Sequence, residues 1–205
     1  MIYLSGCLPI KETIQKRLLL HNVGLMLTPN SQRSVPSDVW QYAADNGCFA
    51  NNWEESKWLR WLETINPNKA LFASVPDVVG DYVSTLLLWE IHADRVKRMG
   101  FKIAFVLQDG IQFKDIPIES ADAFFIGGST AWKLSESTKK LVTQIKEYDK
   151  WVHMGRVNSY RRLQIARDMG CDSTDGTYTA FAPDMNSIKL INMLDKLNRQ
   201  PALQV

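Results

Sequence analysis

The sequence predicts an α/β fold built on a parallel sheet. Short apolar runs of strand length alternate with amphipathic stretches of helical length, about six or seven times along the 205 residues. Continuous apolar runs of this length are typical of strands that are buried on both faces, as in a parallel sheet. Strands that alternate with helices imply right-handed β-α-β crossovers.

The predicted strands are apolar runs that end at a turn or an acidic residue. They cover residues 2–4, 23–27, 70–75, 103–107, 123–126 and 151–154. The predicted helices carry apolar residues at three- and four-residue spacing. They cover residues 10–20, 53–65, 83–99, 135–148, 159–169 and 185–198. Gly100 and Gly170 follow two of these helices, where a glycine commonly ends a helix.

The composition is that of an ordinary globular domain, with 45% apolar and 22% charged residues. The three cysteines, Cys7, Cys48 and Cys171, lie far apart, which argues against a disulfide framework or a Cys-x-x-Cys site and favours a reducing, cytoplasmic location. No apolar run reaches about 18 residues and no signal peptide is evident, so we expect no membrane partner. A net charge of +2 neither requires nor excludes a nucleic-acid partner.

Two architectures fit this pattern, an open doubly wound sheet and a closed (β/α)₈ barrel. The open sheet would normally have a glycine-rich phosphate loop after an early strand, and residues 5–9 (Ser-Gly-Cys-Leu-Pro) do not match G-x-G-x-x-G. A barrel of this length would lie at the short end of its range and would need clipped helices. Both folds place the active site at the carboxyl ends of the strands.

Carboxylates, amides and glycines follow several of the predicted strands. They include Asp45, Asp77, Gln108, Gly127-Gly128 and Asp175. Each alone is more often a turn or cap residue, but together they place several carboxylates at one edge of the sheet. Paired carboxylates suit chemistry at a sugar carbon through an oxocarbenium-like state. Carboxylates and carboxamides also suit the donor edge of a guanine-like base.

Other catalytic classes lack their motifs. His21, His92 and His153 have no zinc-ligand spacing, so no metal site is expected. The sequence contains neither the G-x-S-x-G elbow of an α/β-hydrolase nor a Walker A motif. No cofactor is therefore expected.

These strand-end motifs, in order across roughly residues 43 to 181, resemble those of the tRNA-guanine transglycosylase superfamily. Within it, the chain is most similar to the short DNA-guanine transglycosylase-like proteins of phages and bacteria that insert deazapurines into DNA. The resemblance implies a compact (β/α)₈ TIM-type barrel, with residues 1–205 as one transglycosylase-like domain. It implies a pentosyltransferase that exchanges guanine in DNA for a 7-deazaguanine base in the cytoplasm, which is the host cytoplasm if a phage encodes the chain.

The resemblance also assigns the catalytic residues. Residues 45–49 (Asp-Asn-Gly-Cys-Phe) are similar to the family's Asp-Ser-Gly-Gly-aromatic motif, which implies that Asp45 handles protons and Phe49 stacks on the base. Cys48 stands where the family usually has its second glycine. Asp175, in the segment 172–175 (Asp-Ser-Thr-Asp), matches the family's nucleophile, which implies a covalent aspartyl-glycosyl intermediate.

The substrate-binding residues follow from the same comparison. Asp77 and Gln108 resemble the groups that read the base, and Gly127-Gly128 resembles the turn whose backbone contacts the purine carbonyl. Met154, in the Met-Gly motif, would be the apolar wall beneath the base.

The polynucleotide is less well indicated. The tRNA enzymes carry a cysteine-rich zinc subdomain after the nucleophile, and this chain has no such cluster and has Thr177-Tyr178-Thr179 where they have Pro-Thr-Arg. We therefore expect DNA, single-stranded or with a flipped base, and a free 7-deazapurine as partners. Candidate phosphate contacts are Lys133, Arg156, Arg161, Arg162 and Arg167, unless they form only a solvated helix face.

Several alternatives stay open. Asn158 either caps a helix or touches the substrate, and Trp132 either stacks on a base or packs as a lid. The polynucleotide could instead be tRNA, or the substrate a free nucleoside. The chain could also be a non-catalytic barrel that binds a deazapurine or nucleic acid beside another subunit. A homodimer or an accessory protein are the alternatives for protein partners.

Overall fold

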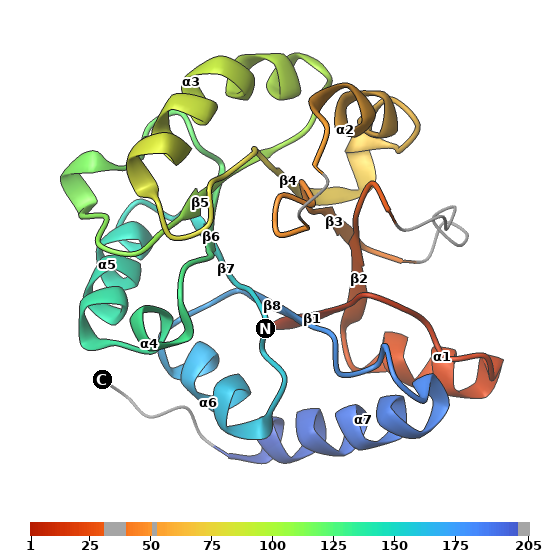
Figure 1. Cartoon of the computed structure of the whole chain (residues 1–205). Coiled ribbons are helices and arrows are strands. Elements are labelled where there is room, and N and C mark those ends of the chain that lie inside the picture. The colour runs from red at the N-terminus through yellow and green to blue at the C-terminus, as the bar shows by residue number, and fades with distance from the viewer. Residues whose placement is uncertain (31–39, 51–52, 201–205) are drawn as a thin grey trace.

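The computed structural model describes residues 1–30, 40–50 and 53–200, and these residues form a closed barrel of parallel strands (Figure 1). The strands follow one another around the barrel in sequence order, and β8 pairs with β1 to close it. They are β1 (Ile2–Ser5), β2 (Val23–Leu27), β3 (Tyr42–Ala44), β4 (Ala70–Ser74), β5 (Ile103–Leu107), β6 (Ala123–Ile126), β7 (Trp151–Met154) and β8 (Ser173–Gly176). The predicted α/β barrel is therefore confirmed, and the open sheet is excluded.

The helices surround the barrel on its outside (Figure 1). They are α1 (Glu12–Leu20), α2 (Glu55–Leu62), α3 (Tyr82–Arg98), α4 (Thr130–Lys133), α5 (Glu136–Lys146), α6 (Tyr160–Asp168) and α7 (Pro183–Arg199). The segment between β5 and β6 contains only a short 3₁₀ turn, η2 (Phe113–Asp115), and a second such turn, η1 (Pro67–Lys69), precedes β4. The connection between β5 and β6 is thus shortened, as a barrel of only 205 residues requires. None of the helices in the described part of the chain is long and apolar enough to cross a membrane.

Two strands are absent from the sequence prediction. β3 has only three residues, and β8 reads Ser-Thr-Asp-Gly, which is too polar to resemble a buried strand. β8 nevertheless pairs on both sides, with Leu4 opposite Asp175 and with His153 opposite Ser173. Its polar residues contact the barrel interior and the site above it. A local apolar pattern in the sequence reveals neither environment.

The core has two layers, and strand alternation decides which layer a side chain enters. The larger layer lies between the strands and the helices. The inner layer fills the barrel with Leu4, Met26, Ala43, Phe72, Ala104 and Ala123, and Phe125 and Trp151 pack against it. Alanines beside phenylalanine and leucine let these side chains interdigitate, so the barrel is a packed core rather than a pore.

Side-chain caps fix several helix starts. Asp81 accepts hydrogen bonds from the backbone N–H of Val83 (3.0 Å) and Ser84 (3.1 Å) at the start of α3. Ser159 caps α6 by accepting from the backbone of Arg162, so Asn158 is not the cap. These caps start the helices directly behind the strand-end loops, and so fix where those loops end.

The approach of β2 to its neighbours requires glycine at position 24. A Cβ on Gly24 would lie 2.6 Å from the Gln41 carbonyl oxygen and 2.9 Å from Leu4 Cδ2, whereas a Cβ on Gly6 would meet nothing within 4 Å. We expect Gly24→Ala to lower the free energy of unfolding by about 1–3 kcal/mol, as overpacking usually does. The measurement is urea unfolding, with Gly6→Ala as the matched control. Equal midpoints for the two variants would contradict this packing.

Candidate active site

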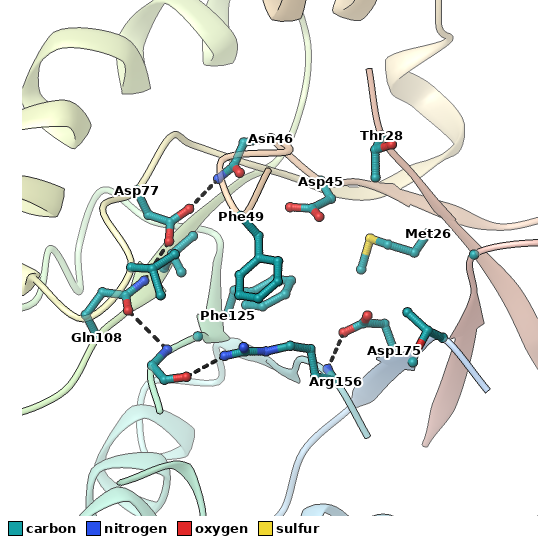
Figure 2. A pocket seen from close by; sticks show the side chains of 17 residues that line it. Met26, Thr28, Asp45, Asn46, Phe49, Asp77, Gln108, Phe125, Arg156 and Asp175 are labelled. Atoms are coloured by element: carbon teal, nitrogen blue, oxygen red, sulfur yellow. Dashed lines mark hydrogen bonds between the residues drawn. The ribbon is translucent and has the colours of Figure 1, made fainter. Parts of the chain in front are cut away.

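A pocket of about 280 Å³ opens at the carboxyl ends of the strands (Figure 2). Every strand of the barrel contributes to it, either directly or through the loop that follows. The lining residues are Gly6, Met26, Thr28, Asp45, Asn46, Phe49, Asp77, Val79, Val106, Gln108, Phe125, Gly127, Gly128, Arg156, Asp175, Gly176 and Thr177. Residues that are far apart in the sequence thus meet at one end of the barrel, as this fold predicts for an active site.

Asp175, on β8, is held through one of its two carboxylate oxygens. Oδ1 lies 3.1 Å from His153 Nε2 and accepts a hydrogen bond of 3.0 Å from the Arg156 backbone N–H. Among the described residues, Oδ2 has no hydrogen-bond donor, and the side chain is 18% exposed. Figure 2 shows the Asp175 and Asp45 carboxylates pointing into the same space, beside Met26. One oxygen of Asp175 is therefore fixed and the other is open to a ligand.

Asp45 follows β3 and has few compensating donors. Ser74 Oγ donates a long hydrogen bond of 3.3 Å to Asp45 Oδ1, and the backbone of Gly47 also donates. Burial, followed by the negative charges of Asp175 and Asp77, raises the pKa of Asp45 from 3.8 to about 7. At neutral pH this carboxyl group can therefore both give and take a proton.

Asp77, after β4, is bound by two amide side chains. Asn46 Nδ2 donates to Oδ1 at 2.9 Å, and Gln108 Nε2 donates to Oδ2 at 2.6 Å. Burial raises the pKa of Asp77, while these two donors and the Arg156 charge oppose the rise. Asn46 was not among the predicted site residues, although its place in the 45–49 motif was a usable signal. The pair of amides fixes the plane of the carboxylate and leaves it facing the pocket.

The Gly127-Gly128 turn does not present a free backbone donor, which corrects the predicted contact with a purine carbonyl. Gly127 N–H donates to the Leu107 carbonyl at 2.9 Å, and Gly128 N–H donates to Gln108 Oε1 at 3.1 Å. A Cβ on Gly127 would lie 2.9 Å from Gln108 Nε2. The turn therefore makes room for Gln108 and orients it toward Asp77. Gln108 keeps one N–H that is not used in this network.

Arg156 lies in the pocket wall rather than on an outer phosphate-binding face. Its guanidinium donates to the Gly128 carbonyl and lies 4.8 Å from the centre of the Phe49 ring. Its φ of 61° is unusual for a residue with a side chain. This left-handed conformation turns the Arg156 N–H toward Asp175 while its side chain crosses the pocket mouth. Phe49, which is 66% exposed, forms the other side of that mouth.

Met154 does not form a wall of the pocket, so that prediction is wrong. It is fully buried between the strands and the helices, whereas its neighbour His153 points into the barrel. Adjacent residues on a strand face opposite sides, and the motif match does not specify which side is which. Met26 and Phe125 supply the apolar surface instead.

The predicted cluster of basic residues is not brought together as a surface. Lys133 is only 4% exposed, and its Nζ donates to the Gly155 carbonyl at 2.7 Å. Burial lowers the pKa of Lys133 to about 8. Arg162 donates to the Arg156 carbonyl at 3.2 Å, and Arg167 pairs with Asp168. The prediction of phosphate contact for Lys133 is therefore wrong, whereas that for the half-buried Arg162 stays a prediction.

Of the remaining residues in that prediction, Arg161 is exposed. Asn158 joins two strand-end loops, because its Oδ1 accepts from the Thr177 backbone at 2.8 Å and its Nδ2 donates to Thr177 Oγ1 at 3.2 Å. Trp132 is partly buried and packs against the core, and its stacking on a base stays a prediction. The described residues contain no group of three His, Cys, Asp or Glu side chains placed to hold a metal ion.

The fold is shared with several solved structures. These include the native KDPGal structure (13% identity, TM-score 0.59, 97% of this chain and 93% of that chain). They also include mandelate oxidase with (S)-2-phenylpropionate (10% identity, TM-score 0.61, 95% and 72%) and the Amycolatopsis orientalis BexX/CysO complex (15% identity, TM-score 0.53, 99% and 93%). At these identities the likeness shows the barrel fold alone. Neither the family models nor the curated proteins compared with the sequence gave a match.

The raised pKa of Asp45 predicts a pH-dependent change in stability. A folded-state pKa of about 7 against an ordinary value of 3.8 means that the wild type loses stability as the pH rises from 3.8 to about 7, and the loss stays constant above that range. We expect Asp45→Asn to be more stable than the wild type by about 1–3 kcal/mol near pH 8, with the difference vanishing near pH 4. Chemical unfolding at both pH values measures it.

A matched variant at Asp81 should show the opposite trend. Hydrogen bonds from Ser84 lower the pKa of Asp81, so its contribution to stability is present above its ordinary pKa of 3.8 and is lost as the pH falls. Asp81→Asn should therefore become less stable relative to the wild type as the pH rises. The same stability difference for Asp45→Asn at both pH values would contradict the protonation of Asp45.

Proposed function

We propose that this chain is a transglycosylase that exchanges guanine in DNA for a 7-deazaguanine base through a covalent intermediate on Asp175. The observation that carries the proposal is the contrast between two carboxyl groups that share one pocket. Asp175 has one oxygen held by N–H donors and one open, while Asp45 has a pKa of about 7. A nucleophile and a proton shuttle require this division of properties. The resemblance of the strand-end motifs to the transglycosylase superfamily supports the same assignment.

The first displacement begins with Asp175 ionised and Asp45 protonated. The open Asp175 oxygen attacks the anomeric carbon, the bond between that carbon and guanine breaks, and the departing base nitrogen takes the proton from Asp45. The products are a glycosyl ester on Asp175, neutral guanine and the Asp45 carboxylate. In the second displacement Asp45 removes the proton from the glycosidic nitrogen of the deazapurine, which attacks the same carbon and releases Asp175. Two inversions restore the original configuration.

The pocket also suits a guanine-like base in its polar groups. The fixed Asp77 carboxylate can accept from the ring N–H and the exocyclic amine of such a base. Arg156 is the donor for its carbonyl oxygen, in place of the engaged Gly127-Gly128 turn. Phe125 and Val106 provide apolar surface for the ring. Guanine would present its N–H donors to the Asp77 carboxylate and its carbonyl oxygen to Arg156. This pairing would distinguish guanine from adenine.

The size of the pocket implies that the substrate base enters alone. About 280 Å³ is close to the lower limit, roughly 300 Å³, for small-molecule sites, and it cannot hold a base pair. A base in DNA would have to leave the helical stack to reach Asp175. Phe49 and Arg161, exposed near the strand-end loops, are the remaining candidates for contact with the flanking strand.

Asp175→Asn tests the nucleophile. We expect it to abolish a denaturation-resistant adduct between the protein and guanine-containing oligonucleotides, because an amide is a poor nucleophile, while binding of the free base persists. Asp81→Asn, which keeps a helix cap outside the pocket, is the control and should form the adduct normally. The assay uses single-stranded DNA, duplex DNA and tRNA, with mass spectrometry of the adduct. An adduct on tRNA alone would move the substrate to RNA, and an undiminished adduct in Asp175→Asn would exclude this nucleophile.

Asp77→Ala tests the recognition of the base. Removing the carboxylate leaves buried donors of the base unpaired, so we expect the affinity for free 7-deazaguanine to fall by about 1–3 kcal/mol, roughly 5- to 150-fold. Calorimetric titration measures the affinity. The loss should be smaller for 7-deazahypoxanthine, which lacks the exocyclic amine that Asp77 would accept from. Equal affinities of the variant and the wild type for 7-deazaguanine would remove this role.

A further inference from the structure

The barrel interior beneath Asp175 contains a fully buried histidine. The His153 ring is packed against Phe125, with ring centres 4.5 Å apart, and against Phe72, at 5.3 Å. A polar ring in an apolar interior is unfavourable unless both of its nitrogens are hydrogen-bonded. Both are: Nδ1 lies 2.8 Å from Ser173 Oγ, and Nε2 lies 3.1 Å from Asp175 Oδ1. Both ring nitrogens of His153 are therefore hydrogen-bonded within the barrel interior.

The direction of each hydrogen bond in this network follows from the chemistry of its ends. Trp151 Nε1 can only donate, and it does so to Ser173 Oγ at 2.9 Å. At the other end, ionised Asp175 can only accept, so His153 Nε2 must carry a proton. Burial lowers the pKa of His153, which leaves the ring neutral and Nδ1 without a proton. The Ser173 hydroxyl then donates to Nδ1, so the hydrogen bonds run in one direction from Trp151 Nε1 through Ser173 and His153 to Asp175 Oδ1.

We infer that His153, oriented by Ser173 and Trp151, is a positioning residue that holds Asp175 Oδ1 and so presents Oδ2 to the sugar carbon. The inference rests on the proposed function, because it assumes that Asp175 is the nucleophile. The Arg156 backbone N–H holds the same oxygen from the loop side. Two donors that converge on one oxygen restrict rotation of the carboxylate. Neither His153 nor Ser173 touches the pocket, and they act only through Asp175.

The same three residue types form the hydrolase triad, but their order relative to the pocket is reversed. In a hydrolase the serine is exposed to the substrate and the aspartate lies behind the histidine. Here Ser173 is fully buried and Asp175 reaches the pocket. A serine nucleophile is therefore excluded by accessibility, and the buried end of the chain serves to fix the tautomer of His153. The charged groups that act on this ring are Asp175 and Lys133.

The test compares two replacements of His153 in the complete chain. His153→Leu removes the donor to Asp175, and we expect the rate of adduct formation to fall roughly 100-fold, the cost of misplacing a reacting group by about an ångström. Its affinity for free 7-deazaguanine should not change. His153→Gln can place an amide N–H near the position of Nε2, and it should recover most of the rate. An unchanged rate in His153→Leu, or equal losses in both variants, would overturn the inference.

A second measurement does not depend on activity or on the folding of a variant. Nitrogen-15 spectra of the wild-type protein labelled at histidine should show the proton of the neutral His153 ring on Nε2 and none on Nδ1 near pH 8. A neutral ring with its proton on Nδ1 would overturn the inference. If the wild type forms no adduct with any nucleic acid, the proposed function fails. If the wild type forms an adduct and His153→Leu forms it equally fast, only the positioning role fails.

Discussion

The pairing of β8 with both of its neighbours is the constraint on which the site depends. β8 is short and polar, and it stays in place because its backbone pairs with β1 on one side and β7 on the other. The register with β7 places His153 opposite Ser173, which is what lets the ring reach both Ser173 and Asp175. A slip of one residue would turn the carboxylate of Asp175 toward the helices. The strand pairing that closes the barrel therefore also orients the Asp175 carboxylate.

Three carboxyl groups share this pocket, and each has a different set of hydrogen-bond donors. Asp77 has two amide donors and the nearby charge of Arg156, and Asp175 has His153 and a backbone N–H. Asp45 has only a long bond from Ser74 and a backbone donor, so burial, followed by the repulsion of the other two carboxylates, raises its pKa to about 7. It is the group that holds a proton near neutral pH. The distribution of donors, rather than the residue type, therefore gives Asp45 protonation properties that differ from those of the other two carboxyl groups.

The apolar patterns of the sequence predicted a parallel α/β fold and most of the pocket, whereas the closed barrel was implied by the resemblance of the strand-end motifs. Long buried strands and capped helices have local apolar patterns, so each predicted strand and helix was confirmed to within three residues of its ends. Strand-end carboxylates were found because parallel strands bring their carboxyl ends together. β8 was missed because its residues are polar and lack the apolar pattern of a buried strand. Met154 was placed on the wrong side because a motif match gives a position in the chain and leaves its facing undetermined.

The basic residues beside the site show why a charge cluster in the sequence is a poor guide to a phosphate-binding surface. Three cations after β6 and β7 each donate to a carbonyl of a strand-end loop: Lys133 to Gly155, Arg156 to Gly128 and Arg162 to Arg156. Carbonyls in these loops lie outside the regular ladder and need donors, and a long cationic side chain can reach them across a loop.

These cations therefore hold together the two loops that position Arg156 and orient Asp175. A phosphate group would compete with a loop carbonyl for the same donor, and the competition would loosen the pocket. If the chain acts on a polynucleotide as proposed, the strand would more favourably meet exposed side chains such as Phe49 and Arg161, where replacing their water costs little of the site's own structure. Contacts with the strand and recognition in the pocket would then be made by different residues.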